Sequence, residues 1–201
     1  MIDFFLLLDQ PRQPWVVEER LHAAFLERSR QCHPDRFHEA DPLEKREAHD
    51  RYVELNSAYH QLKEHRSRLL HLIQLETGNT PADVQEIPHD TTDLFMQVGQ
   101  ACREADQFLK AHANAASSIL KAQRLIQARP VLARCQTILQ SLEAWQGKLV
   151  EVLQQHNESW LASDSNHGKL LSDLEQLSRL LSYQDRWTRQ IKERMFLLTS
   201  P

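Results

Sequence analysis

Imidazole, carboxylate and guanidinium groups meet in one short stretch of the chain, at His33-Pro34-Asp35 with Arg30 and Arg36 on either side. A His and an Asp two residues apart could act as an acid–base pair, but such a pair needs a nucleophile within reach. The sequence places none there, so we expect no enzymatic activity. Pro34 makes this stretch a turn, because it lacks an N–H and disfavours the α conformation at His33.

Two amphipathic helices are expected to hold this turn. Before it, apolar residues recur at helical spacing, at Val17, Leu21, Ala24, Phe25 and Cys32. After it, the spacing returns at Tyr52, Leu55, Tyr59 and Leu62. Asp41 is suited to cap the second helix, and Pro42 to occupy its first position. Two antiparallel helices joined in this way would expose the polar turn at one end.

Residues 2–76 resemble a J-domain, and specifically the J-domain of the HscB-type co-chaperones of iron–sulfur cluster assembly. Residues 3–8 (DFFLLL) match the short first helix of that family. Residues 55–62 (LNSAYHQL) are close to the J-domain pattern of its third helix, and residues 68–75 (RLLHLIQL) look like the additional helix that follows in HscB-type proteins. Beyond the J-domain the resemblance is patchy. It rests on residues 93–96 (DLFM) and on Arg179, Leu181, Tyr183, Asp185 and Arg186.

The resemblance implies a function for the turn. In the family, His-Pro-Asp docks between the nucleotide and substrate domains of a DnaK/HscA-type ATPase and favours ATP hydrolysis. Here the chaperone-binding residues would be His33, Pro34 and Asp35, with Arg30 and Arg36 adding charge for a negatively charged partner. Asp35 only accepts hydrogen bonds, so it would pair with an arginine of the chaperone.

The resemblance also implies a client-binding surface on the C-terminal part. In the family, an apolar patch ringed by acidic residues binds the scaffold protein on which clusters form, and the corresponding residues here are Phe95, Met96 and Tyr183. The acidic ring is largely replaced, since Gln97, Gln100, Arg103 and Gln107 leave only Glu104 and Asp106. Gly99 also stands where the pattern has Leu.

The J-domain departs from the family pattern as well. Glu18, Glu19 and Glu27 weaken the basic face of the second helix, which favours a dedicated chaperone partner. Arg28 stands on the apolar face where the family has Leu, and we expect its stem to cover the core with the guanidinium at the edge. Cys32 takes a position usually held by an aromatic residue, and we interpret it as a small buried thiol.

We divide the chain into a J-domain (1–77), a linker (78–91) and a C-terminal helical domain (92–201). The linker carries Gly78-Asn79-Thr80-Pro81 and Ile87-Pro88-His89-Asp90, which are turn and cap signals. Three helices should follow: one from about Thr92 that either continues past Asn114 or breaks near it, one starting at Pro130, and one after 164–168. Heptad spacing on all three predicts a coiled-coil-like three-helix bundle, longer than is usual in the family.

Composition narrows the function classes. The 201 residues include only four Gly, which favours an all-α protein, and no Gly-rich phosphate loop, so the chain should not bind ATP itself. A net charge of −4 gives no reason to expect nucleic-acid binding. Three widely spaced Cys and eleven scattered His suggest a reducing compartment and neither a metal nor a cofactor. No signal peptide or membrane span is evident, so we expect a cytoplasmic protein without membrane contact.

Three hypotheses remain open. The first is a co-chaperone that stimulates a DnaK/HscA-type ATPase and delivers the iron–sulfur scaffold. The second keeps the J-domain but delivers another client. The third is a structural or homo-oligomeric helical protein with no ATPase-stimulating role, which an exposed heptad seam would favour.

Overall fold

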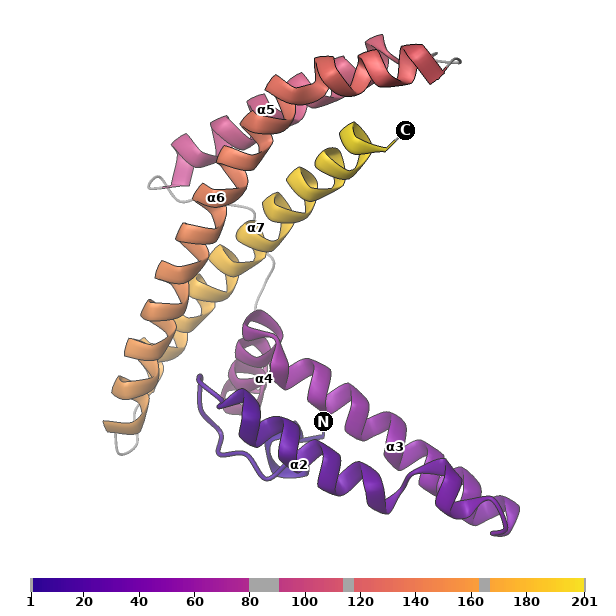
Figure 1. The fold of residues 1–201 in the computed structure, drawn as a ribbon. Helices are drawn as coiled ribbons and strands as arrows, with labels where there is room; N and C mark the ends of the chain where they lie inside the picture. Colours follow the sequence, from indigo (N-terminus) through magenta and orange to yellow (C-terminus); the bar gives the residue numbers. More distant parts are fainter. Residues whose placement is uncertain (1, 80–90, 114–117, 163–166, 201) are drawn as a thin grey trace. The chain divides into compact units, whose positions relative to one another are not determined.

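The computed structural model describes residues 2–79, 91–113, 118–162 and 167–200, and every regular element within these ranges is a helix (Figure 1). The elements are α1 (Phe4–Leu7), α2 (Glu18–Gln31), the 3₁₀ turn η1 (Pro34–Phe37), α3 (Pro42–Lys63), α4 (His65–Thr77), α5 (Thr92–Ala111), α6 (Ser118–Ala162) and α7 (Gly168–Thr199). The predicted all-α fold, with a helical hairpin followed by three long helices, is confirmed.

The chain divides into two compact units. One comprises residues 1–82 and 151–179, and the other comprises 83–150 and 180–201. The first unit therefore includes the adjoining ends of α6 and α7, which the sequence prediction assigns to the C-terminal domain 92–201. Most of the predicted linker, residues 80–90, lies outside the described residues, so the proposed domain boundaries stay a prediction.

Local capping sets the helix ends of the first unit. Asp3 Oδ1 accepts hydrogen bonds from the backbone N–H groups of Phe5 and Leu6, which starts α1. Asp41 caps α3 in the same way, with Pro42 at its first position, as predicted. Gly78 ends α4 in the left-handed region, with φ at 74°, where a side chain would be strained.

Helices α2 and α3 lie side by side as an antiparallel pair (Figure 1). Leu21, Leu55 and Leu62 are buried between the helices of this unit, as their spacing predicts. The ring of Phe25 stacks on Tyr59 with the centroids 4.6 Å apart. Val17 is an exception, because it precedes α2 in an extended conformation and its side chain is 40% exposed.

The ends of α6 and α7 join the first unit through the segment that connects α1 to α2. Trp160 Nε1 donates a hydrogen bond to the Arg12 carbonyl at 3.1 Å, and the Trp15 N–H donates to Asn157 Oδ1 at 3.0 Å. Trp160 and Asn157 are both buried. These long-range hydrogen bonds explain why residues 151–179 group with the N-terminal unit.

In the second unit α5, α6 and α7 form one apolar core. Its buried members are Val98, Ala101, Cys102, Ala105, Ala128, Cys135, Ile138, Leu142, Tyr183, Trp187, Ile191 and Leu198. The heptad positions of the predicted bundle therefore face one another, and the seam of α7 is buried at Leu181 and Ile191. A buried seam removes the sequence argument for self-association along it.

The predicted helix start at Pro130 is wrong. Helix α6 begins at Ser118 and continues through Pro130 without interruption. A proline inside a helix loses one hydrogen bond and costs about 3 kcal/mol. Pro130 and Ile126 are exposed, so water can bind the Ile126 carbonyl, while Ala128 and Cys135 anchor the helix on its buried side.

Candidate functional site

The His-Pro-Asp sequence forms the joint between α2 and α3. Helix α2 ends at Gln31, and His33 is extended, with φ −63° and ψ 132°, as the following proline requires. Pro34 then opens the short turn η1, which leads towards the Asp41 cap. The turn thus lies at the far end of the hairpin, where the sequence analysis expects it.

The imidazole of His33 is held on two sides. The backbone N–H of Asp35 donates to its Nδ1 at 3.3 Å, and the ring meets Tyr52 of α3 edge-on with the centroids 5.7 Å apart. Because Nδ1 accepts this hydrogen bond, the neutral ring carries its proton on Nε2. Asp35 Oδ2 lies 3.5 Å from the same Nδ1, so a protonated ring could bond the carboxylate instead.

The Asp35 carboxylate points outwards, with 89% of its side chain exposed. Its backbone carbonyl, by contrast, is held by His38, whose Nδ1 lies 3.0 Å away. The arrangement fixes the backbone and leaves the carboxylate oxygens able to accept further hydrogen bonds. An exposed carboxylate on a fixed backbone is suited to bind a guanidinium.

The two arginines beside the turn are placed differently. Arg36 Nη1 donates to the Arg30 carbonyl at 3.2 Å, so it satisfies one of the free carbonyls at the end of α2. The Arg30 side chain is exposed and forms no ion pair within the part of the chain that the structure describes. Arg36 therefore supports the shape of the turn, whereas Arg30 supplies a free positive charge.

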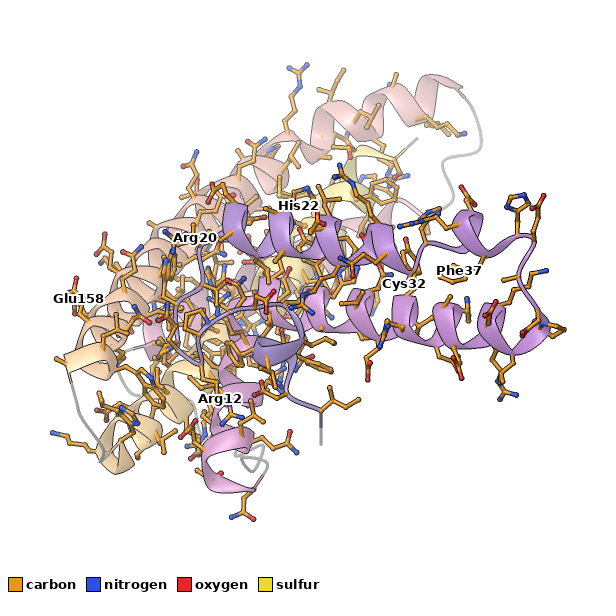
Figure 2. The ribbon with its side chains drawn as sticks, turned by 90° about the horizontal axis from the view of Figure 1, so that it is seen from below. Arg12, Arg20, His22, Cys32, Phe37 and Glu158 are labelled. Carbon is orange, nitrogen blue, oxygen red and sulfur yellow. The ribbon has the colours of Figure 1, made fainter. Side chains whose placement is uncertain are left out.

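A hollow of about 580 Å³ lies behind the turn, between the end of α2 and the start of α3. Figure 2 shows Cys32 and Phe37 at this place, with Arg20 and His22 further back along α2. Cys32 is 3% exposed, and burial raises the pKa of its thiol, with Arg51 acting in the opposite direction. The interpretation of Cys32 as a small buried thiol is confirmed.

The opposite end of the hairpin is held by Arg68 of α4, which is 2% exposed. Its guanidinium donates to the carbonyls of Pro14 and Leu62 at 2.8 and 2.7 Å and to His65 Nδ1 at 2.7 Å. Burial lowers the pKa of Arg68 to about 10 and that of His65 to about 4. The sequence analysis missed this role, although its signal was an arginine directly before the apolar run that begins at Leu69.

The three predicted client-binding residues lie in the second unit. Phe95 and Met96 of α5 are 38% and 59% exposed, whereas Tyr183 of α7 is 7% exposed. Phe95 and Tyr183 both contact Trp187, with ring centroids 5.8 and 5.7 Å apart. The structure therefore brings Phe95 and Tyr183 to one aromatic cluster, but Tyr183 is largely covered.

Trp187 was missed in the sequence analysis, although it stands four residues from both Tyr183 and Ile191 on the buried stripe of α7. Its ring also stacks against Trp145 of α6 at 5.5 Å. Trp187 thus connects all three helices beneath Phe95.

Among the described residues no group of three or more His, Cys, Asp or Glu side chains could hold a metal ion. Within the same residues no helix is long and apolar enough to cross a bilayer.

The structure describes a helical hairpin with a His-Pro-Asp joint and a bundle of long helices, the arrangement that the resemblance to J-domain proteins with a helical C-terminal domain implies. No family model matches the chain. The chain is 33% identical over 97 residues to "Co-chaperone protein HscB" of Proteus mirabilis, and this match covers 48% of the chain and 56% of the relative. It is 36% identical over 105 residues to "Co-chaperone protein HscB homolog" of Cupriavidus taiwanensis, and this match covers 52% of the chain and 58% of the relative. The matches thus span little more than half the length of these relatives.

The fold extends the likeness over nearly the whole chain. The crystal structure of the human co-chaperone protein HscB aligns with 98% of this chain and 82% of its own, with a TM-score of 0.60 and 21% identity. The chaperone HscB from Vibrio cholerae aligns over 96% of each chain, with a TM-score of 0.62 and 17% identity. The resemblance to HscB-type J-domain co-chaperones is therefore confirmed, by sequence over half of the chain and by fold over almost all of it.

Proposed function

We propose that this protein is an HscB-type co-chaperone. It binds a DnaK/HscA-type chaperone through His33-Pro34-Asp35, stimulates its ATPase, and delivers the iron–sulfur cluster assembly scaffold as client. The observation that carries the proposal is the joint itself, where an exposed Asp35 carboxylate stands on a backbone held by His33 and His38. The likeness to proteins named as HscB co-chaperones supports it.

The proposed role requires recognition and no covalent chemistry. Asp35 would accept hydrogen bonds from an arginine of the chaperone, a charge-assisted contact that contributes about 1.5–3 kcal/mol. His33 would donate from Nε2, because its Nδ1 is already used within the turn. Arg30 would steer the approach of a negatively charged surface, an effect that salt weakens.

The client would bind the second unit through Phe95 and Met96. Exposed Phe and Met side chains on one helix form an adaptable apolar contact surface. Trp187 contacts Phe95 and is itself in contact with Tyr183, so the Phe95 ring is supported from the core side. Tyr183 would support the surface and make little direct contact with the client, because most of its own surface is covered.

Single-turnover ATP hydrolysis tests the chaperone part of the proposal. Each DnaK-type chaperone of the source organism would be mixed with the wild-type protein, with His33→Gln and with His49→Gln as a matched control, because His49 is an exposed histidine of α3 in the same hairpin. We expect stimulation by the wild type and by His49→Gln, and its loss in His33→Gln. A folded wild-type protein that stimulates none of these chaperones would exclude the proposal and leave the structural hypothesis.

Delivery of a different client is the second candidate. One observation favours it: the two carboxylates that remain beside the apolar patch, Glu104 and Asp106, are both engaged by arginines of this chain. Calorimetric titration of the protein with the purified scaffold distinguishes the two candidates. Binding supports the scaffold as client, and absence of binding supports a different client.

A further inference from the structure

Two guanidinium groups border the apolar patch formed by Phe95, Met96, Tyr183 and Trp187. On α5, a methyl group added to Gly99 would lie 3.4 Å from Arg103 Nη1. The Arg103 side chain therefore folds back over the turn that follows Phe95 and Met96. Its Nη2 also donates to Gln100 Oε1 at 2.8 Å, which holds it there.

Arg186 lies on the α7 side of the same patch. Its guanidinium carbon stands over the Tyr183 ring, 5.7 Å from the centroid. The side chain is exposed, so the guanidinium can pair with an incoming group while it keeps its contact with the ring. A cation against an aromatic face that is buried on its other side is held in place at little entropic cost.

The two carboxylates that follow Arg103 on α5, Glu104 and Asp106, are already paired. Glu104 binds Arg134 of α6 at 3.3 Å and also accepts from Gln100 at 2.8 Å. Asp106 accepts two hydrogen bonds from Arg194 of α7, at 3.0 and 2.9 Å. Both acids therefore tie α5 to its neighbours.

No carboxylate pairs with Arg103 or Arg186 in the described part of the chain. The exposed acid on the same face of α5 is Asp93 in the first turn, three residues before Met96. Within the set of Arg103, Arg186 and Asp93, two positive groups stand against one negative group, so these three residues together carry a net positive charge.

We propose that this patch binds an acidic docking face of the client: an apolar side chain against Phe95 and Met96, with carboxylates that pair with Arg103 and Arg186. The inference rests on the proposed function and specifies the chemistry of its client. Arginine suits this role, because its planar guanidinium binds a carboxylate through two hydrogen bonds. A client face rich in lysine and arginine would be repelled.

Calorimetric titration of the full-length protein with the purified iron–sulfur scaffold of the same organism tests the inference. The variants are Arg103→Glu, Arg186→Glu and Met96→Ala, and the matched control is Arg129→Glu, an exposed arginine of α6 in the same unit. Circular dichroism and thermal unfolding verify that each variant folds. We expect each Glu variant and Met96→Ala to raise the Kd at least tenfold, and the control to change it less than twofold.

The dependence of the Kd on salt concentration shows whether the charges of the two proteins attract or repel each other. For the wild type the Kd should rise with ionic strength, and for the double variant Arg103→Glu/Arg186→Glu this slope should be lost or reversed. Binding of the scaffold with a Kd unchanged or improved in the Glu variants would overturn the inference and leave the proposed function intact. Absence of scaffold binding by the wild type would overturn the scaffold assignment itself, whatever the ATPase assay shows.

Vesicles of phosphatidylglycerol distinguish a protein carboxylate from a lipid phosphate as the partner. Co-sedimentation of the wild type with these vesicles, abolished in Arg103→Glu, would assign the patch to a membrane surface and contradict the inference. We expect the protein to remain in the supernatant.

Discussion

Arg28 on α2 and Asp9 after α1 form an ion pair, in which Arg28 Nε donates to Asp9 Oδ2 at 3.2 Å. Arg28 thus has 35% of its side chain exposed, with its guanidinium at the edge of the apolar face, as the sequence analysis expects. Asp9 adopts a left-handed conformation with φ 50°, which turns the chain after α1 towards α2. The pair therefore links the short first helix to the helix that ends at the His-Pro-Asp joint.

Removal of this ion pair should lower the free energy of unfolding slightly, by an amount that depends on pH. The hydrogen bond from Arg28 lowers the pKa of Asp9 below its ordinary value of 3.8, so the pair stabilises the fold above that pH and loses its effect as the pH falls through the lowered value. Because Asp9 is 68% exposed, Asp9→Asn should cost less than about 1 kcal/mol at pH 7. Urea unfolding of Asp9→Asn at pH 7 and pH 3 measures this loss of stability, with Asp50→Asn as the control. An equal loss at both pH values would contradict this account.

His65 should make the first unit less stable in mild acid. Burial, aided by the Arg68 charge, holds its pKa at about 4 against the ordinary 6.5. Between these values the unfolded chain binds a proton that the folded chain does not, so stability falls as the pH drops from 6.5 to 4. The loss is on the order of 2–3 kcal/mol. His65→Gln, which keeps a hydrogen-bond acceptor for Arg68, should flatten the pH profile of the urea midpoint in this window. The same slope in the variant would refute the assignment to His65.

Arg68→Met should destabilise the protein strongly. The substitution leaves the carbonyls of Pro14 and Leu62 without their buried donor, and each unsatisfied buried group costs about 1–3 kcal/mol. We expect a loss on the order of 3 kcal/mol in urea unfolding. Arg66→Met is a suitable control, because Arg66 is a partly exposed neighbour on the same helix. A loss below about 1 kcal/mol would show that water replaces the guanidinium.

Asp35→Asn should separate chaperone binding from folding. The side chain is 89% exposed, so the urea midpoint should stay within experimental error of the wild type. The concentration that gives half-maximal ATPase stimulation should rise more than tenfold, since a charge-assisted contact is lost. Glu39→Gln, an exposed carboxylate just after the turn, should change neither value. Unaltered stimulation in Asp35→Asn would remove Asp35 from the chaperone contact.

Elements set by local chemistry could be predicted from the sequence. Pro34 ends α2 and extends His33 through sterics within two residues, and Asp41-Pro42 starts α3 by satisfying its own first turn. The buried stripes of α2, α3, α5 and α7 also follow from helical spacing, because a helix with one apolar face must bury it. The joint with its exposed Asp35 was therefore predictable, and so was the bundle.

Other features depend on contacts between residues distant in the sequence. Pro130 carries a strong local signal for a helix start, yet packing around Ala128 and Cys135 keeps α6 continuous through it. Tyr183 matched a client-binding position by resemblance, but contact with Trp187 shows it to be largely covered.

What the sequence determined by itself was the class of fold and the location of the recognition turn, because both arise from interactions a few residues apart. The tertiary structure alone decided which charges remain free. In the sequence, Glu104 and Asp106 look like the remainder of an acidic ring. In the structure they form ion pairs with Arg134 of α6 and Arg194 of α7. Arg103 and Arg186 are left with no acid partner among the described residues for the same reason. Ion pairing acts through space over a few ångströms, and only the fold brings these side chains within that distance.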